Sequence, residues 1–343
     1  MRILKKWTAV LLCIALIASY CAVGAAAEEP AAAASIGVNT YTSVTAAVAA
    51  AAKGDTIKLE MNVTEDVTIP STAELTLDLN GYTLTGVTKA PAKPDATAAG
   101  ETVAPFIQTA ITNEGKLTIT DSSEEKMGTV KAAGEYDGAL LNKAGATATL
   151  NGGTFTDALS TGGCWYIVVN LGTMEINAGV TVANQNPENT SDTALINGCD
   201  QQLFPGDALT GYVAPSDAVM TINGGTFTSG LFVVKNGDWY AQMTIKGGTF
   251  AAKNSHVNGC TLSNANNCPM TVTGGTFTAA GDTPVVKCKD KTAYIGNGTG
   301  TGLSIQGGTF TAGATGDVLQ TITKDGSDGA DVVPILNITS GSF

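Results

Sequence analysis

Arginine, histidine and charged residues in general are scarce in this sequence. The 343 residues include 18 lysines and arginines, 30 aspartates and glutamates and one histidine, and charged residues make up only 14% of the chain. Arg2 is the sole arginine. Proteins that bind nucleic-acid phosphates need a strongly basic surface. The sequence therefore predicts no nucleic-acid partner.

The first 27 residues have the pattern of a secretory signal peptide. A basic head with Arg2, Lys5 and Lys6 precedes an apolar run and an alanine-rich exit. Without this segment, 15 lysines stand against 30 acidic residues, a net charge of −15. We expect the mature chain to be secreted or held at the cell surface, without membrane insertion. A lipoprotein signal with Cys21 as the modified residue is the alternative.

Cysteine is too sparse for a dense disulfide framework. Five cysteines follow the signal segment, so at least one is unpaired or bonded outside the chain: Cys164, Cys199, Cys260, Cys268 and Cys288. Cys260 and Cys268 could form a bridge, and buried thiols are an equal alternative. Because no Cys-x-x-Cys or similar ligand spacing occurs, we expect neither a metal nor a cofactor.

A glycine-rich phrase recurs through the second half of the chain. It has the form x-Gly-Gly-Thr-Phe and begins at Asn151, Asn223, Lys246, Thr273 and Gln306. A shorter copy, Ser340-Gly-Ser-Phe343, ends the sequence, and degenerate copies begin at Met127 and Asn177. An alternating apolar triplet such as Met243-Thr-Ile245 precedes most copies, which is typical of a short half-buried strand followed by a tight turn.

A second element lies upstream of each triplet, an apolar pair followed by a polar turn, as in Val168-Val-Asn170, Val233-Val-Lys-Asn236 and Val285-Val-Lys287. Each repeat thus contains three short strands separated by turns, and the repeat length varies between about 23 and 34 residues, as expected for a solenoid. The pattern predicts a parallel β-helix, in which identical positions stack at about 4.8 Å.

Stacking makes two predictions about equivalent side chains. The repeated phenylalanines should form an aromatic stack inside the solenoid: Phe155, Phe227, Phe250, Phe277, Phe310 and Phe343. The turn asparagines should form a ladder: Asn113, Asn142, Asn170 and Asn236. Asparagine suits such a turn because it tolerates the left-handed region and forms local hydrogen bonds.

The N-terminal part of the mature chain is predicted to cap the first coil of the solenoid. Ser43 can serve as the N-cap of an amphipathic helix over residues 43–53, and strands are predicted at 56–59, 67–69, 75–79 and 82–84. Protruding loops are expected at residues 89–105 and 184–217. We therefore assign residues 28–343 to one β-helix domain, with coils from about residue 56 and an incomplete C-terminal end. An uncapped end of this kind favours end-to-end self-association or continuation in a longer protein.

Residues 47–84, with the phrases AKGDTIKLEMNVTEDVTI and LTLDLNGYTLTG, precede GKLTITDSS and the repeats. This arrangement resembles secreted or surface right-handed parallel β-helix proteins of gut-type Firmicutes, within the pectate-lyase-like superfamily. The resemblance implies an all-β, right-handed solenoid but does not specify a function. Enzymes of that superfamily use arginine-containing or Gly-His-Gly motifs, and neither can be placed on this chain, so we predict no catalytic residue.

A few isolated polar residues could in principle take part in catalysis or metal binding. His256 stands in an asparagine-rich stretch and is typical of a turn, although a general base is the alternative. Three aspartates of the long loop are interpreted as solvated surface residues, with a catalytic role as the alternative: Asp192, Asp200 and Asp207. Three others near the C-terminus are interpreted as turn residues, with calcium binding as the alternative: Asp325, Asp328 and Asp331. Paired threonines around the repeated phenylalanines could form a flat array like that of ice-binding β-helices, or simply favourable strand surface.

Two aromatic pairs are the candidate ligand-binding residues: Trp165, Tyr166, Trp239 and Tyr240. Exposed aromatic rings on a rigid coil can stack on sugars, whereas packing under a loop is the alternative. We expect an exported, non-catalytic, adhesin-like scaffold that contacts a glycan or a host surface protein. The alternative is a lyase or glycoside hydrolase acting on a neutral polysaccharide.

Overall fold

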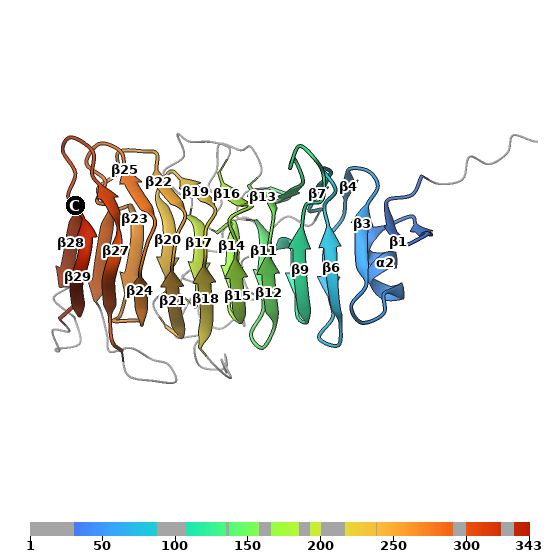
Figure 1. Ribbon diagram of the computed structural model, residues 1–343, viewed down its shortest axis with the longest axis horizontal. Coiled ribbons are helices and arrows are strands. Elements are labelled where there is room, and N and C mark those ends of the chain that lie inside the picture. The colour runs from blue at the N-terminus through green and yellow to red at the C-terminus, as the bar shows by residue number, and fades with distance from the viewer. Residues whose placement is uncertain are drawn as a thin grey trace, which may run out of the picture. The chain divides into compact units, whose positions relative to one another are not determined.

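Short parallel strands stacked side by side make up almost all of the structure, a computed structural model (Figure 1). It describes residues 31–87, 108–134, 137–157, 166–184, 193–199, 217–237, 239–290, 300–323 and 333–343. The chain is an all-β, right-handed parallel β-helix, as the repeats predict. Among the described residues, no helix has the length and hydropathy needed to span a bilayer. The predicted signal segment lies outside the described residues.

Each coil contributes one strand to each of three faces. Two faces belong to a 20-stranded sheet within the described residues, and the third is a sheet of nine strands. The first face contains β3 (Thr56–Leu59), β6 (Glu74–Asp78), β9 (Lys116–Thr120), β12 (Thr147–Leu150), β15 (Thr173–Ile176), β18 (Ala218–Ile222), β21 (Ala241–Ile245), β24 (Met270–Val272), β27 (Leu303–Thr311) and β29 (Leu336–Ser342).

The second face carries the glycine-rich phrase. Its strands are β4 (Val63–Thr64), β7 (Thr83–Thr85), β10 (Thr129–Lys131), β13 (Gly153–Thr156), β16 (Val180–Ala183), β19 (Thr226–Ser229), β22 (Thr249–Ala252) and β25 (Thr276–Ala279), continued by the second halves of β27 and β29. The nine-stranded sheet contains β5 (Val67–Ile69), β8 (Thr109–Asn113), β11 (Gly138–Asn142), β14 (Val168–Asn170), β17 (Thr193–Asn197), β20 (Phe232–Asn236), β23 (Cys260–Ala265), β26 (Val286–Asp290) and β28 (Leu319–Thr323).

The glycine pair makes the turn between the first two faces. At the second glycine of the phrase, φ lies between 97° and 115° in five successive clear copies, for example 112° at Gly275. Residues that carry a side chain rarely adopt such a positive φ, whereas glycine does so readily. At the first glycine the limit is space, because a Cβ on Gly274 would lie 2.4 Å from the carbonyl oxygen of Lys246 in the coil below. The repeated phrase is therefore a requirement of stacked tight turns.

The phenylalanine stack is real but shorter than predicted. Phe227, Phe250, Phe277 and Phe310 are buried, with neighbouring ring centroids 4.7 Å apart and planes within 6°. Phe155 occupies the same column but is separated from Phe227 by Val182, because β16 carries valine at this position. Phe343 stacks on Phe310 at 5.1 Å yet is 55% exposed. Its predicted place inside the solenoid is therefore wrong.

The asparagine ladder is confirmed and is longer than predicted. Each side-chain amide nitrogen donates to the side-chain oxygen of the next asparagine, at 2.7, 2.7, 2.8, 3.1 and 2.9 Å, along Asn113, Asn142, Asn170, Asn197, Asn236 and Asn264. All six side chains are buried. The amide groups also bond to backbone carbonyls of the adjoining turns, so the ladder satisfies polar groups that would otherwise be buried without partners.

The predicted loop at residues 184–217 is wrong in one respect, because it contains strand β17. The segment Thr193–Asn197 pairs in register with β14 and β20. Its Leu195 and Ile196 followed by Asn197 repeat the apolar pair and turn asparagine of the other coils. The polar residues on both sides hide this pattern in the sequence. The predicted loop at residues 89–105 lies outside the described residues.

A helix and a hairpin cap the N-terminal end. Helix α2 (Val44–Ala50) begins at Ser43, whose side chain accepts a hydrogen bond from the backbone of Ala46 at 3.0 Å, as predicted. The hairpin of β1 (Ala34–Ile36) and β2 (Asn39–Tyr41) was not predicted. Because β1 pairs antiparallel with β3, the hairpin covers the first strand edge.

Candidate functional site

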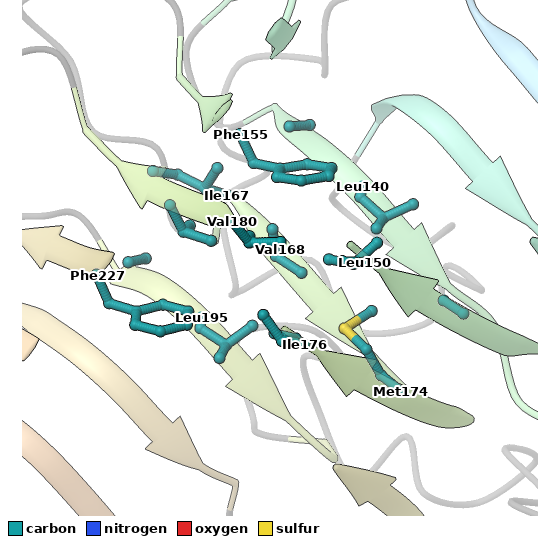
Figure 2. Packing of buried hydrophobic residues seen from close by; sticks show 14 of the residues in the cluster. Leu140, Leu150, Phe155, Ile167, Val168, Met174, Ile176, Val180, Leu195 and Phe227 are labelled. Atoms are coloured by element: carbon teal, nitrogen blue, oxygen red, sulfur yellow. The ribbon is translucent and has the colours of Figure 1, made fainter. Parts of the chain in front are cut away.

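The outer face of the nine-stranded sheet is unusual because it is apolar over several coils. Side chains alternate along each strand, so Leu140, Val168 and Leu195 point into the solenoid core (Figure 2). Their chain neighbours Leu141, Val169 and Ile196 point outward. Yet these outward side chains are at most 8% exposed. They belong to a second hydrophobic cluster, separate from the core.

This outer apolar cluster includes two of the predicted binding residues. Tyr166 is 1% exposed within it, and the partly exposed Trp239 packs against it. Trp239 also exchanges two backbone hydrogen bonds with Cys199, at 3.1 and 3.2 Å. Tyr240 is partly exposed in the next turn, where its φ is 54°. Trp165 lies outside the described residues. The structure thus brings Tyr166 and Trp239 together, and their binding of a sugar stays a prediction.

Three lysines follow the apolar positions on the same outer face. In the column of Ile196, the next three coils place Lys235, Ser263 and Lys287 in register. Lys289 lies two residues beyond Lys287, on the same face. We call Lys235, Lys287 and Lys289 the lysine cluster. Toward the C-terminus, this outward column therefore changes from apolar side chains to lysines.

Aromatic rings lie beneath these cations. The Nζ atom of Lys235 is 5.9 Å from the ring centroids of both Tyr166 and Phe232, and the Nζ atom of Lys289 is 5.3 Å from that of Phe232. These distances are within the range of cation–π attraction. Two ammonium groups therefore converge on one phenylalanine ring, which is itself partly exposed.

Comparison with protein families, curated proteins and solved structures finds no match to this chain. Its function must be inferred from its own residues. The sequence analysis assigned no role to these three lysines. The signal was present in the repeat itself: Lys235 and Lys287 occupy the outward position after the apolar pair, where the coils of Asn142, Asn170 and Asn197 carry leucine, valine or isoleucine.

Two polar groups in this region, a lysine and a thiol, are buried. Lys287 is 2% exposed, and its Nζ atom donates to the carbonyl oxygen of Val257 at 2.8 Å. Burial lowers the pKa of Lys287, and the nearby Cys260 acts in the opposite sense. Burial also raises the pKa of the Cys260 thiol to about 11, although the three lysines act to lower it. Cys260 is therefore a neutral thiol at neutral pH and a poor nucleophile.

The described cysteines other than Cys260 are also buried thiols: Cys199, Cys268 and Cys288. The alternative of a Cys260–Cys268 bridge is therefore not what the structure contains. Cys164 lies outside the described residues. No three histidine, cysteine, aspartate or glutamate side chains within the described ranges are grouped so that they could hold a metal ion.

Carboxylates near the N-terminal coils hold turns together. Asp121 accepts backbone hydrogen bonds from Gly81, Ser123 and Gly128 at 2.8, 3.1 and 2.7 Å. Burial acts to raise the pKa of Asp121, but these bonds and that of the Ser123 hydroxyl outweigh it and hold the pKa below its ordinary value. Asp78 similarly accepts from the backbone of Asn80 and Ser122.

The structure shows where His256 and the repeated threonines lie. The Nδ1 atom of His256 accepts a hydrogen bond from the backbone of Asn258 at 3.2 Å, which is the geometry of a turn. Thr154 and its equivalents form an outward column on the second face, whereas Thr156, expected to face out, is 1% exposed. The acidic residues 192, 200, 207, 325, 328 and 331 lie outside the described residues.

Proposed function

We propose that this chain is an exported, non-catalytic β-helix of the secreted pectate-lyase-like kind, which binds a glycan on the outer face of its nine-stranded sheet. The observation that carries the proposal is the grouping of aromatic rings there. Tyr166 and the partly exposed Trp239 share the outer apolar cluster, and the partly exposed Phe232 lies in the adjoining coil. Aromatic rings held on a rigid scaffold provide flat apolar faces on which sugar rings stack.

The surroundings of the aromatic rings favour binding over catalysis. Hydrolysis of a glycosidic bond needs two carboxyl groups about 5 to 10 Å apart across the bond. Among the buried carboxylates, Asp78 and Asp121 accept hydrogen bonds from turn backbone in the N-terminal coils, and Asp217, next to the strand that follows Tyr240, accepts one from the side chain of Gln242 at 2.6 Å. The thiol of Cys260, which is in register with Phe232 on the neighbouring strand, is protonated at neutral pH.

A glycan array probed with the wild-type chain and with Trp239→Leu tests this function. Leucine keeps apolar volume against the outer apolar cluster but removes the flat ring, so we expect glycan binding to weaken about tenfold with little change in melting temperature. Tyr82→Leu is a matched control, because Tyr82 packs partly exposed against the solenoid core.

Two results would overturn the proposal. The first is an array on which the wild-type chain binds no glycan. The second is Trp239→Leu binding as tightly as wild type. Release of reducing sugar from a bound polysaccharide would instead favour the enzymatic alternative.

A further inference from the structure

The coil of β29 leaves core-type side chains open to solvent. Strand β29 continues the inward columns of β27, and Ile338 is in register with Ile305. Ile305 is fully buried, whereas Ile338 is 42% exposed. In the aromatic column, Phe310 is 1% exposed and Phe343, which stacks on it, is 55% exposed. The same inward positions therefore lose their cover at this coil.

The strands at this end also have an uncovered hydrogen-bonding edge. Within the described residues, β29 pairs only with β27, and β28, at the same end of the solenoid, pairs only with β26 (Figure 1). The seven residues of β29 include neither a charged residue nor a proline. Natural edge strands are commonly protected by charge, by proline or by short length. Because β29 has none of these features, its edge is suited to pairing with another strand.

The distribution of charge favours a second copy of this chain as the partner. The whole sequence is acidic, with 30 aspartates and glutamates against 18 lysines and arginines. Like net charge keeps copies of such a protein apart over most of their surface. No side chain from Val333 to Phe343 carries a charge. Two copies can therefore approach each other through this neutral, partly apolar end with the least repulsion.

The N-terminal end of the solenoid does not offer a matching surface. The hairpin of β1 and β2 covers that end, because β1 occupies the edge of β3. Charged groups also lie there: Glu60 accepts a hydrogen bond from the Ser35 hydroxyl at 2.6 Å, and Lys53 pairs with Glu74 at 3.0 Å. The end formed by β28 and β29 thus matches the same end of another copy. A contact between identical surfaces closes as a dimer, whereas a head-to-tail contact can continue into a filament.

We propose that the end of the solenoid formed by β28 and β29 binds the same end of a second copy, giving a two-fold symmetric dimer. A two-fold axis perpendicular to the solenoid reverses the strand direction, so β29 pairs antiparallel with the β29 of the second copy. The pairing gives the edge N–H and C=O groups partners and covers Ile338 and Phe343. This interface is a property separate from glycan binding and does not rest on it.

Sedimentation equilibrium of the whole chain tests the dimer. Between about 1 and 100 µM, we expect the average mass to rise from one chain to two and no further. Ile338→Lys places a charge in the β29 edge and should weaken dimerisation at least about tenfold. Val219→Lys is the matched control, because Val219 is a strand residue of similar exposure, 39%, in the middle of the solenoid. This control should dimerise as wild type.

Three results would overturn the proposal. A chain that stays monomeric up to about 100 µM leaves this end to a different protein segment. A mass that grows beyond two chains indicates a head-to-tail contact. Dimerisation that Ile338→Lys leaves unchanged places the interface elsewhere. If Ile338→Lys fails to fold, Asn337→Lys makes the same test, because Asn337 is an exposed residue of the same strand. Hydrogen exchange of the β29 amides should in addition slow as the wild-type concentration rises.

Discussion

Phe250→Ala is the most direct test of the stacked core. The Phe250 side chain is fully buried between Phe227 and Phe277, with ring centroids 4.7 Å away on both sides. Truncation of a buried phenylalanine to alanine costs about 3 to 5 kcal/mol of unfolding free energy, from lost burial and from the cavity that remains. Two stacked neighbours, each contributing about 0.5 to 1.5 kcal/mol beyond burial, favour the upper half of that range.

The chain contains a matched control in the same column. Phe343 stacks on one ring, at 5.1 Å, and is 55% exposed. Because more than half of its surface already meets water, we expect Phe343→Ala to cost about 1 kcal/mol or less. The comparison holds the residue type and the type of contact constant, and it varies burial and the number of stacked neighbours.

Urea unfolding followed by circular dichroism measures both losses. Coils in a solenoid contact only their neighbours, so hydrogen exchange of the β22 amides should be measured in parallel to detect local opening. A loss below about 1 kcal/mol for Phe250→Ala, without faster exchange in β22, would refute the stacked register. Equal losses for the two variants would also refute it.

The ladder and the thiol give two further predictions. Asn170→Ala should cost about 3 kcal/mol in urea unfolding, because the Asn142 amide nitrogen loses one of its acceptors and the buried side-chain oxygen of Asn197 loses its ladder donor, at about 1 to 3 kcal/mol each, whereas Asn177→Ala, in a partly exposed pair, should cost below about 1 kcal/mol. Similar losses would contradict the ladder. The pKa of Cys260 is raised from 9.0 to about 11, so the unfolded thiol loses its proton first, and the stability that the thiol contributes should be complete below pH 9 and lost toward pH 11. Unfolding of wild type and Cys260→Ala should therefore differ in pH dependence only in that window, and parallel curves would contradict the raised pKa.

Local chemistry made much of the fold predictable. A glycine pair followed by Thr-Phe fits one conformation, with φ near 112° at Gly275 and no room for a Cβ at Gly274. Alternating triplets such as Met243-Thr-Ile245 form strands whatever lies beside them. The helix at Ser43 follows equally from its own cap. These features depend on a few neighbouring residues, so the sequence alone determined the coil and its repetition.

Details of stacking required the tertiary structure. Val182 interrupts the phenylalanine column because β16 deviates from the phrase, and β17 was hidden among polar residues. The first strand edge is covered by β1, a segment that has no signal of its own. In each case the partner of a strand, rather than its local pattern, determined the outcome.

The candidate site was determined only by the tertiary structure. Tyr166, Phe232, Lys235 and Lys289 are separated by up to 123 positions in the sequence. They meet because parallel stacking places successive coils about 4.8 Å apart, so long side chains from different coils reach the same ring. The sequence determined that aromatic and charged residues occupy outward positions. Which of them share one patch depended on the register of the nine-stranded sheet.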